Sequence, residues 1–347
     1  MSFSPSKLLR LYGACILTLT CFGLYLEVEA SQSRVETLRA VTSVSPIIMG
    51  RFQEPIGCAE TTTREILILD RRAHTVSLVS ADRKSVRKIL EIGGEQGRVL
   101  SPGVLALSQD DIFAVADAPA GQERIQYFSL TGSRLGGFWL AKRVAPRLVI
   151  GPLVLNGVGS MHFTGKTFLV NEPDAGGLFS ERDVEGTTIR QIGVLRPTSQ
   201  ESDRDLHLAL NIGLPLADPG GGFYFVFQTG RPMFRKYDAN GTLVFERHIE
   251  GVELDASIQA LPTTWPARAT GALPLVSPLV RTAGVDADGR LWISLMTPFT
   301  YVYDRSGDKT RTVQLEAGGD LVSPVSLFFT RQGRLLVTPG CHEFAVK

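Results

Sequence analysis

The sequence predicts an all-β fold, and two observations carry that prediction. The apolar residues alternate or occur in runs of four or five, which is typical of short buried strands rather than of helices. The 347 residues include 35 glycines and 19 prolines, which favour a chain with many turns. The runs with the clearest strand pattern are ILILD (66–70), DIFAVAD (111–117), TFLVNE (167–172), FYFVFQ (223–228), LWISLM (291–296) and RLLVTPG (334–340).

Each of these runs belongs to a repeated unit of four strands. A tight hairpin leads into the run, as in PLADPGGGFYFV, and a second hairpin follows it, as in FRKYDANGTLVFERH. Stacking such units around an axis protects the strand edges of each sheet, so the repeat predicts a six-bladed β-propeller. The equivalent strands of the copies begin near Ile66, Ile112, Thr167, Phe223, Leu291 and Leu335.

The turn in GVDADGRLWIS resembles a calcium loop at first sight. With Gly289 at the sixth loop position, the first and twelfth ligands would be Gly284 and Leu295, which have no side-chain oxygen. Asp286 and Asp288 are therefore predicted to shape a hairpin turn.

One stretch resembles a repeat of the NHL-type six-bladed propellers. Residues 92–138 have the Gly-rich lead-in, Pro102 before the inner strand, a strand that ends at Asp117, and then a glycine turn after RIQYFSLT. In LDRRAHTVSLVSAD, Asp70 and His74 occupy the Asp and His positions of the family, whereas the residues at the usual Asn and Arg positions differ. The resemblance implies that Asp70, His74 and Asp117 tie blade turns together, and it indicates a fold rather than an activity.

The last copy is incomplete, so a strand from the beginning of the chain is needed to finish it. We expect that strand within residues 40–50, where it would close the last blade. By the strand count, Cys58 and Cys341 fall on the same rim of neighbouring blades, which predicts a disulfide that staples the closure. Two buried thiols are the alternative.

The first residues predict a secretory signal peptide. Lys7 and Arg10 precede the apolar run ACILTLTCFGLYL, and Val28 and Ala30 stand where a signal peptidase requires small residues. An uncleaved membrane anchor is the alternative, although the apolar run is shorter than the about 20 residues of a spanning helix. The predicted organisation of this secreted or periplasmic chain is a signal peptide at 1–30, an N-terminal segment at 31–57 and the propeller at 58–347.

Charge gives no reason to expect nucleic acid as a partner, because 36 basic residues nearly balance 35 acidic ones. A membrane contact is expected only through the N-terminal segment if it stays uncleaved, and we expect a monomer.

Alternation of strand direction places the connections between second and third strands, and those between blades, on one face of the propeller. Three of these connections are long: 140–157, 195–215 and 251–280, the last with a short helix expected in ELDASIQALP. Long loops on a rigid scaffold are common binding sites, although these could instead only cap the channel. The predicted ligand-binding residues are Arg71, Arg72, Glu172, Arg231 and Trp265, and Asn171 and Thr297 add polar groups near the channel mouth.

The sequence favours a binding module that recognises a protein, peptide or glycan through this long-loop face. The five histidines show no metal-site spacing, so no metal ligands and no cofactor are predicted. The alternative is a metal-dependent enzyme resembling lactonases and lyases, with calcium or zinc at the central channel and Glu60 as one ligand. Whether the protein is an enzyme stays open at this point.

Overall fold

The computed structural model describes residues 35–140, 147–150, 153–155, 160–269 and 271–346. The chain divides into two units, Met1–Arg34 and Val35–Lys347. The predicted signal peptide lies outside the described residues, as do parts of the first long connection, and everything below concerns the second unit.

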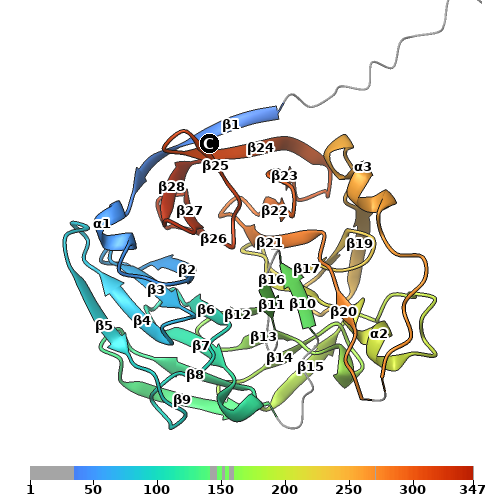
Figure 1. The fold of residues 1–347 in the computed structure, drawn as a ribbon, viewed down its shortest axis with the longest axis horizontal. Helices are drawn as coiled ribbons and strands as arrows, with labels where there is room; N and C mark the ends of the chain where they lie inside the picture. Colours follow the sequence, from blue (N-terminus) through green and yellow to red (C-terminus); the bar gives the residue numbers. More distant parts are fainter. Residues whose placement is uncertain (1–34, 141–146, 151–152, 156–159, 270, 347) are drawn as a thin grey trace, which may run out of the picture. The chain divides into compact units, whose positions relative to one another are not determined.

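Four sheets each contain four antiparallel strands in chain order (Figure 1). The first contains β2 (Pro55–Glu60), β3 (Ile66–Asp70), β4 (Thr75–Val79) and β5 (Val86–Leu90). The second contains β6 (Val104–Leu107), β7 (Phe113–Asp117), β8 (Arg124–Phe128) and β9 (Arg134–Trp139). The third contains β12 (Met161–Phe163), β13 (Phe168–Asn171), β14 (Phe179–Arg182) and β15 (Thr188–Ile192). The fourth contains β16 (Gly213–Ala217), β17 (Phe223–Phe227), β18 (Met233–Tyr237) and β19 (Leu243–His248).

A nine-stranded sheet contains both ends of the described chain. One half contains β21 (Val280–Val285), β22 (Leu291–Leu295), β23 (Thr300–Tyr303) and β24 (Lys309–Ala317), with β25 (Asp320–Val322) paired to β24. The other half contains β26 (Ser326–Phe329), β27 (Arg334–Thr338) and β28 (His342–Ala345). The strand β1 (Val35–Ser43) joins the halves, because it runs parallel to β24 and antiparallel to β28. It begins five residues before the range in which the sequence predicts an N-terminal strand.

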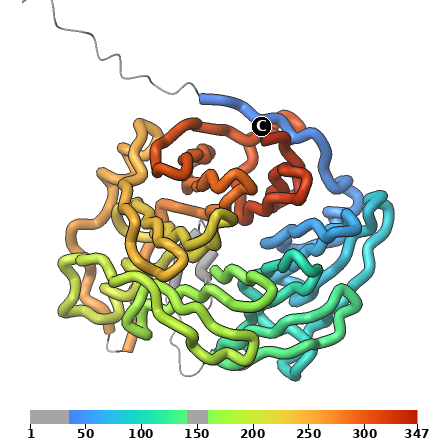
Figure 2. The backbone as a smooth tube through the Cα atoms, turned by 180° about the vertical axis from the view of Figure 1, so that it is seen from behind, coloured from blue at the N-terminus to red at the C-terminus, as the bar shows by residue number. Residues whose placement is uncertain are grey.

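The first strands of the successive sheets form a closed circle. β2, β6, β12, β16, β21 and β26 contact one another in this order, and β26 contacts β2 again. The sheets therefore radiate from a common centre, as Figures 1 and 2 show from opposite sides. The all-β propeller class that the sequence predicts is confirmed.

Burial explains why the second strand of each unit has the clearest sequence signal. Every residue of β3, β7, β17 and β22 is buried, because neighbouring sheets cover both faces of these strands. Strands buried on both faces read as continuous apolar runs. The fourth strands β5, β15 and β19 are partly exposed and carry more polar residues.

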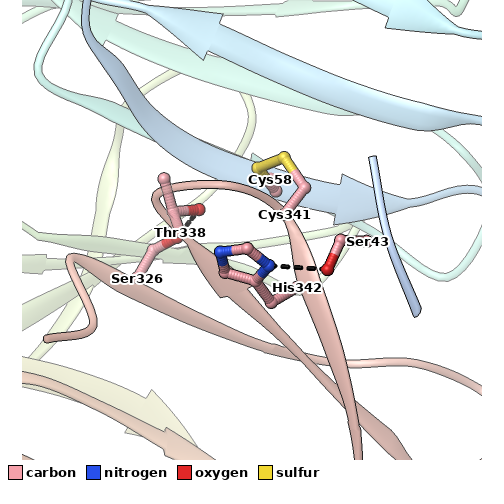
Figure 3. The surroundings of a disulfide bond; sticks show 6 residues. All are labelled: Ser43, Cys58, Ser326, Thr338, Cys341 and His342. Atoms are coloured by element: carbon pink, nitrogen blue, oxygen red, sulfur yellow. Dashed lines mark hydrogen bonds between the residues drawn. A yellow bond between two sulfur atoms is a disulfide. The ribbon is translucent and has the colours of Figure 1, made fainter. Parts of the chain in front are cut away.

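The predicted disulfide joins Cys58 to Cys341. Cys58 lies within β2, and Cys341 immediately precedes β28, so the bond connects the first sheet to the last (Figure 3). Both cysteines pack in an apolar cluster with Ile48 of the short helix α1 (Pro46–Met49). Ser43, at the end of β1, adds a hydrogen bond of 2.7 Å between its Oγ and His342 Nδ1.

Candidate functional site

The third long connection contacts both of the others. A small sheet contains β11 (Leu153–Leu155), β10 (Arg147–Ile150) and β20 (Leu275–Val276), in which β10 runs parallel to β20. The connection after β9 is thereby paired with the connection after β19, and in Figure 1 β10 and β11 lie near the middle of the circle of sheets. The second connection contains α2 (Arg204–Ala209), and the third contains α3 (Val252–Gln259). α3 confirms the expected short helix.

An apolar cluster holds the second and third connections together. Leu206 and Leu210, from the α2 region, pack with Val276 of β20, and Trp265 is packed against them. Arg268 adds an ion pair of 2.5 Å to Asp203, the residue that caps the N-terminus of α2. Trp265, one of the predicted ligand residues, therefore has a packing role in this face.

A buried arginine fixes the base of the second connection. The Arg196 guanidinium donates to the carbonyl groups of Leu210, Thr229 and Arg231, and it lies 4.3 Å from the ring centroid of Phe227. Burial lowers the pKa of Arg196 to about 10, so it remains a cation at neutral pH. Arg231 serves here through its backbone, and its side chain is exposed.

The other predicted ligand residues do not converge. Arg71 pairs with Glu54, and Glu172 pairs with Arg182 at 2.8 Å. Arg72 is exposed. In the described part of the chain, no hydrogen bond or ion pair joins any two of the five predicted ligand residues. Their role in binding stays a prediction.

The residues that the NHL resemblance assigns to blade turns make structural contacts. Asp70 accepts hydrogen bonds from the backbone N–H groups of Gln53, Glu54 and Ala73. His74 Nδ1 accepts a bond of 2.8 Å from the backbone N–H of Ser101, which lies at the end of the lead-in to the second sheet.

Asp117 forms the most buried of these contacts. Both of its oxygens accept 2.8 Å bonds from the Arg124 guanidinium, whose remaining donors reach the carbonyl groups of Gly94 and Arg98. Both side chains are almost fully buried, so this ion pair is part of the framework.

Three polar residues lie close together at the ends of β17 and β22 and in β21, on the long-loop face. The backbone carbonyl of Gln228 accepts from the N–H of Leu279 at 2.8 Å, and its side-chain Nε2 donates 3.1 Å to the carbonyl of Arg281. The Arg281 guanidinium in turn lies 3.5 Å from the carbonyl of Met296, next to Thr297. We call Gln228, Arg281 and Thr297 the axial polar cluster.

Each member of the axial polar cluster has an unmatched polar atom. Gln228 Oε1, Arg281 Nε and Thr297 Oγ1 are shielded and make no hydrogen bond to the described residues. The carbonyl of Arg281 requires a donor, so the Gln228 amide nitrogen must face it and the amide oxygen must point elsewhere. Arg281 also has no carboxylate partner within the described part of the chain, and burial lowers its pKa. Thr297 was expected at the channel mouth, whereas Gln228 and Arg281 were not predicted as site residues.

Glu60 does not have surroundings that suit a metal ion. Burial raises the pKa of Glu60, and the nearby charge of Glu343 raises it further. Arg83 lies 3.4 Å from Glu60, and Arg334 lies 2.8 Å from Glu343, so each carboxylate already faces a cation. Within the described ranges, no three His, Cys, Asp or Glu side chains gather in a way that could hold a metal ion.

The helices of the described residues are all too short or too polar to cross a membrane. The chain matches no family model. It likewise matches no curated protein.

Solved structures with similar backbones include a gluconolactonase from Xanthomonas campestris, with a TM-score of 0.47 and 15% identity over 84% of this chain and 85% of that chain. A virginiamycin B lyase from Staphylococcus aureus has a TM-score of 0.49 and 11% identity over 87% of this chain and 96% of that one. A protein of unknown function from Bacteroides caccae has a TM-score of 0.44 and 12% identity, with coverages of 75% and 81%. The chain's own strand arrangement establishes the propeller.

Proposed function

We propose that this chain is a secreted or periplasmic six-bladed propeller of NHL type that binds a peptide, protein or glycan through its long-loop face. Dividing the nine-stranded sheet between β24 and β1 gives six blades, with β1 as the last strand of the final blade. The disulfide agrees with an oxidising compartment.

The observation that carries the proposal is the axial polar cluster. A buried polar atom without a partner costs about 1–3 kcal/mol, and Gln228, Arg281 and Thr297 each have one. Recognition is one reason for a native fold to keep such groups, because a ligand that supplies the partners then binds specifically. The cluster offers a guanidinium, a hydroxyl and an amide oxygen. It therefore suits a carboxylate that has a hydroxyl or an amide N–H on one of the next two carbons.

Thermal unfolding with small probes tests this function. Galacturonate represents the glycan arm, N-acetylglycine represents the peptide arm, and galactose is the uncharged control. A probe at about 100 times its Kd stabilises the folded state by about 2.7 kcal/mol. We expect a rise in Tm with at least one carboxylate, no rise with galactose, and loss of the rise in Arg281→Gln.

Lys166→Gln is the matched control, because Lys166 is an exposed cation in the β12–β13 turn. It should retain the rise in Tm. The proposal fails if neither carboxylate raises Tm, or if Arg281→Gln responds as the parent protein does.

A metal-dependent enzyme remains the alternative function, and a metal analysis distinguishes it from the binding function. Stoichiometric calcium or zinc that survives dialysis of the purified protein would favour the enzyme. The paired surroundings of Glu60 and Glu343 give the binding function the stronger support.

A further inference from the structure

A hollow of about 580 Å³ lies against the outer half of the first sheet. Its walls come from β4 and β5, from the turn between β3 and β4, and from the segment that follows α1. The lining residues that matter below are Arg51, Phe52, Arg72, Thr75, Ser77 and Lys88. The volume lies within the range of small-molecule sites, about 300–1,000 Å³. Nothing in the proposed function uses this hollow.

The lining is strongly cationic. Arg51, Arg72 and Lys88 each line the hollow, and none of them has a carboxylate partner among the residues that the structure describes. Asp70 is the acidic residue of the lining, and three backbone N–H groups already bind its oxygens. Three cations against one carboxylate leave an excess of two positive charges.

Two hydroxyl-bearing residues of low exposure line the same hollow. Thr75 is 7% exposed and Ser77 is 5% exposed, and both are lining residues of β4. Neither hydroxyl makes a side-chain hydrogen bond within the described ranges, and neither oxygen is among the fully shielded atoms there, so both can reach the hollow. Because β4 is a regular strand, residues two apart point to the same face, so the two hydroxyls lie side by side along the wall.

Phe52 supplies an apolar wall. It packs, together with Val86 of β5, at the edge of the cluster that contains Cys58 and Cys341. The lining thus combines hydrogen-bond donors and positive charge with an apolar surface. This is the usual composition of a site for an organic anion, in which a few polar groups orient the ligand and apolar groups contact its body.

We propose that this hollow binds a phosphate or sulfate group that is carried on a larger organic molecule. Arginine, lysine and hydroxyl side chains are the donors that oxyanions require. A phosphate monoester carries about −1.5 to −2 charge at neutral pH, which matches the excess of the lining. The volume greatly exceeds that of the oxyanion, so the body of the ligand contacts Phe52.

Isothermal titration calorimetry of the purified protein tests the proposal. The probes are glucose 6-phosphate, glucose 6-sulfate, inorganic phosphate and glucose. We expect heat from at least one of the two esters, weaker binding of inorganic phosphate and no heat from glucose. Replacing both Arg72 and Lys88 by glutamine should weaken ester binding by at least about 10-fold, because a charge-assisted hydrogen bond contributes about 1.5–3 kcal/mol.

Three further variants make the result specific. Lys84→Gln removes an exposed cation from the β4–β5 turn, outside the lining, and should leave the affinity unchanged. Ser77→Ala should weaken binding several-fold with little change in Tm. Arg281→Gln should bind the esters normally, which separates this site from the axial polar cluster.

The proposal is overturned if neither ester gives heat, or if the Arg72 and Lys88 double variant binds as the parent does. Equal affinity for glucose 6-phosphate and inorganic phosphate would overturn the inference that the group is carried on a larger molecule.

Discussion

Removing the Cys58–Cys341 bond should lower the stability of the fold by a predictable amount. The bond closes a loop with a sequence separation of 283 residues. In the chain-entropy relation a loop of this length corresponds to about 5.6 kcal/mol at 25 °C, and measured losses are about 2–5 kcal/mol. We therefore expect a loss of about 3–5 kcal/mol. With an unfolding entropy of about 2.1 cal/mol/K per residue over about 300 residues, Tm should fall by about 5–8 °C.

The measurement is scanning calorimetry of three forms: the oxidised protein, the reduced protein, and the Cys58→Ala, Cys341→Ala double variant. The reduced protein retains both buried side chains, so its difference from the oxidised form isolates the cross-link. The double variant adds the packing lost at the two buried positions. A reduced protein that unfolds within 1 °C of the oxidised form would refute the idea that this bond staples the closure.

Three further changes have defined outcomes. Burial lowers the pKa of His162 to about 4, so the folded state binds fewer protons than the unfolded chain between pH 4 and about pH 6.5. The free energy of unfolding should have its full value above pH 6.5 and fall by roughly 1–3 kcal/mol as the pH falls to 4. Urea titrations at several pH values should show a weaker pH dependence of this free energy in His162→Gln, and the same dependence as in the parent protein in His248→Gln. Arg124→Met should cost about 3–5 kcal/mol in the same assay, because it leaves a buried carboxylate uncompensated; a loss below 1 kcal/mol would contradict the framework role. Asp286→Ala should cost about 2–3 kcal/mol, since Asp286 binds a buried indole N–H and two backbone N–H groups, whereas Asp288→Ala at an exposed position should change stability by less than about 0.5 kcal/mol.

The propeller could be predicted from the sequence because its most buried strands carry the pattern. The residues 223–227 and 291–295 are buried on both faces and, apart from Ser294, apolar, and the turns before them contain Asp and Gly at the positions that a tight reversal requires. Asp286 indeed accepts from the N–H groups two and four residues later, and Gly289 has a φ of +76°. Local residue preferences were sufficient for these elements.

The strand β1 could be placed only approximately. Its sequence VETLRAVTS is exposed or partly exposed at every position, so it has no alternation that would fix its bounds. β1 pairs with β24 and β28, which are more than 260 residues away in the chain. The pattern of a single sequence does not show which distant strands will pair.

The site was less predictable for a related reason. Arg71 and Glu172 stand in loops and look free in the sequence, yet each has a partner that a different segment supplies. Arg281 looks like an ordinary strand residue, but the register shift between Val280 and Thr282 takes it out of the regular ladder. Whether a charge is paired depends on the tertiary neighbours, and the sequence lists only the local ones.

The pairing of β1 has a consequence for the order in which the molecule is assembled. During synthesis residues 35–43 emerge early, whereas their partners at 309–317 and 342–345 emerge late. Until then β1 is an unpaired strand, so the incomplete chain presents an edge to which other chains can add. Contacts between such distant segments also form slowly, because the intervening chain must be ordered first. A nascent chain of this kind is expected to depend on chaperones until its last residues arrive.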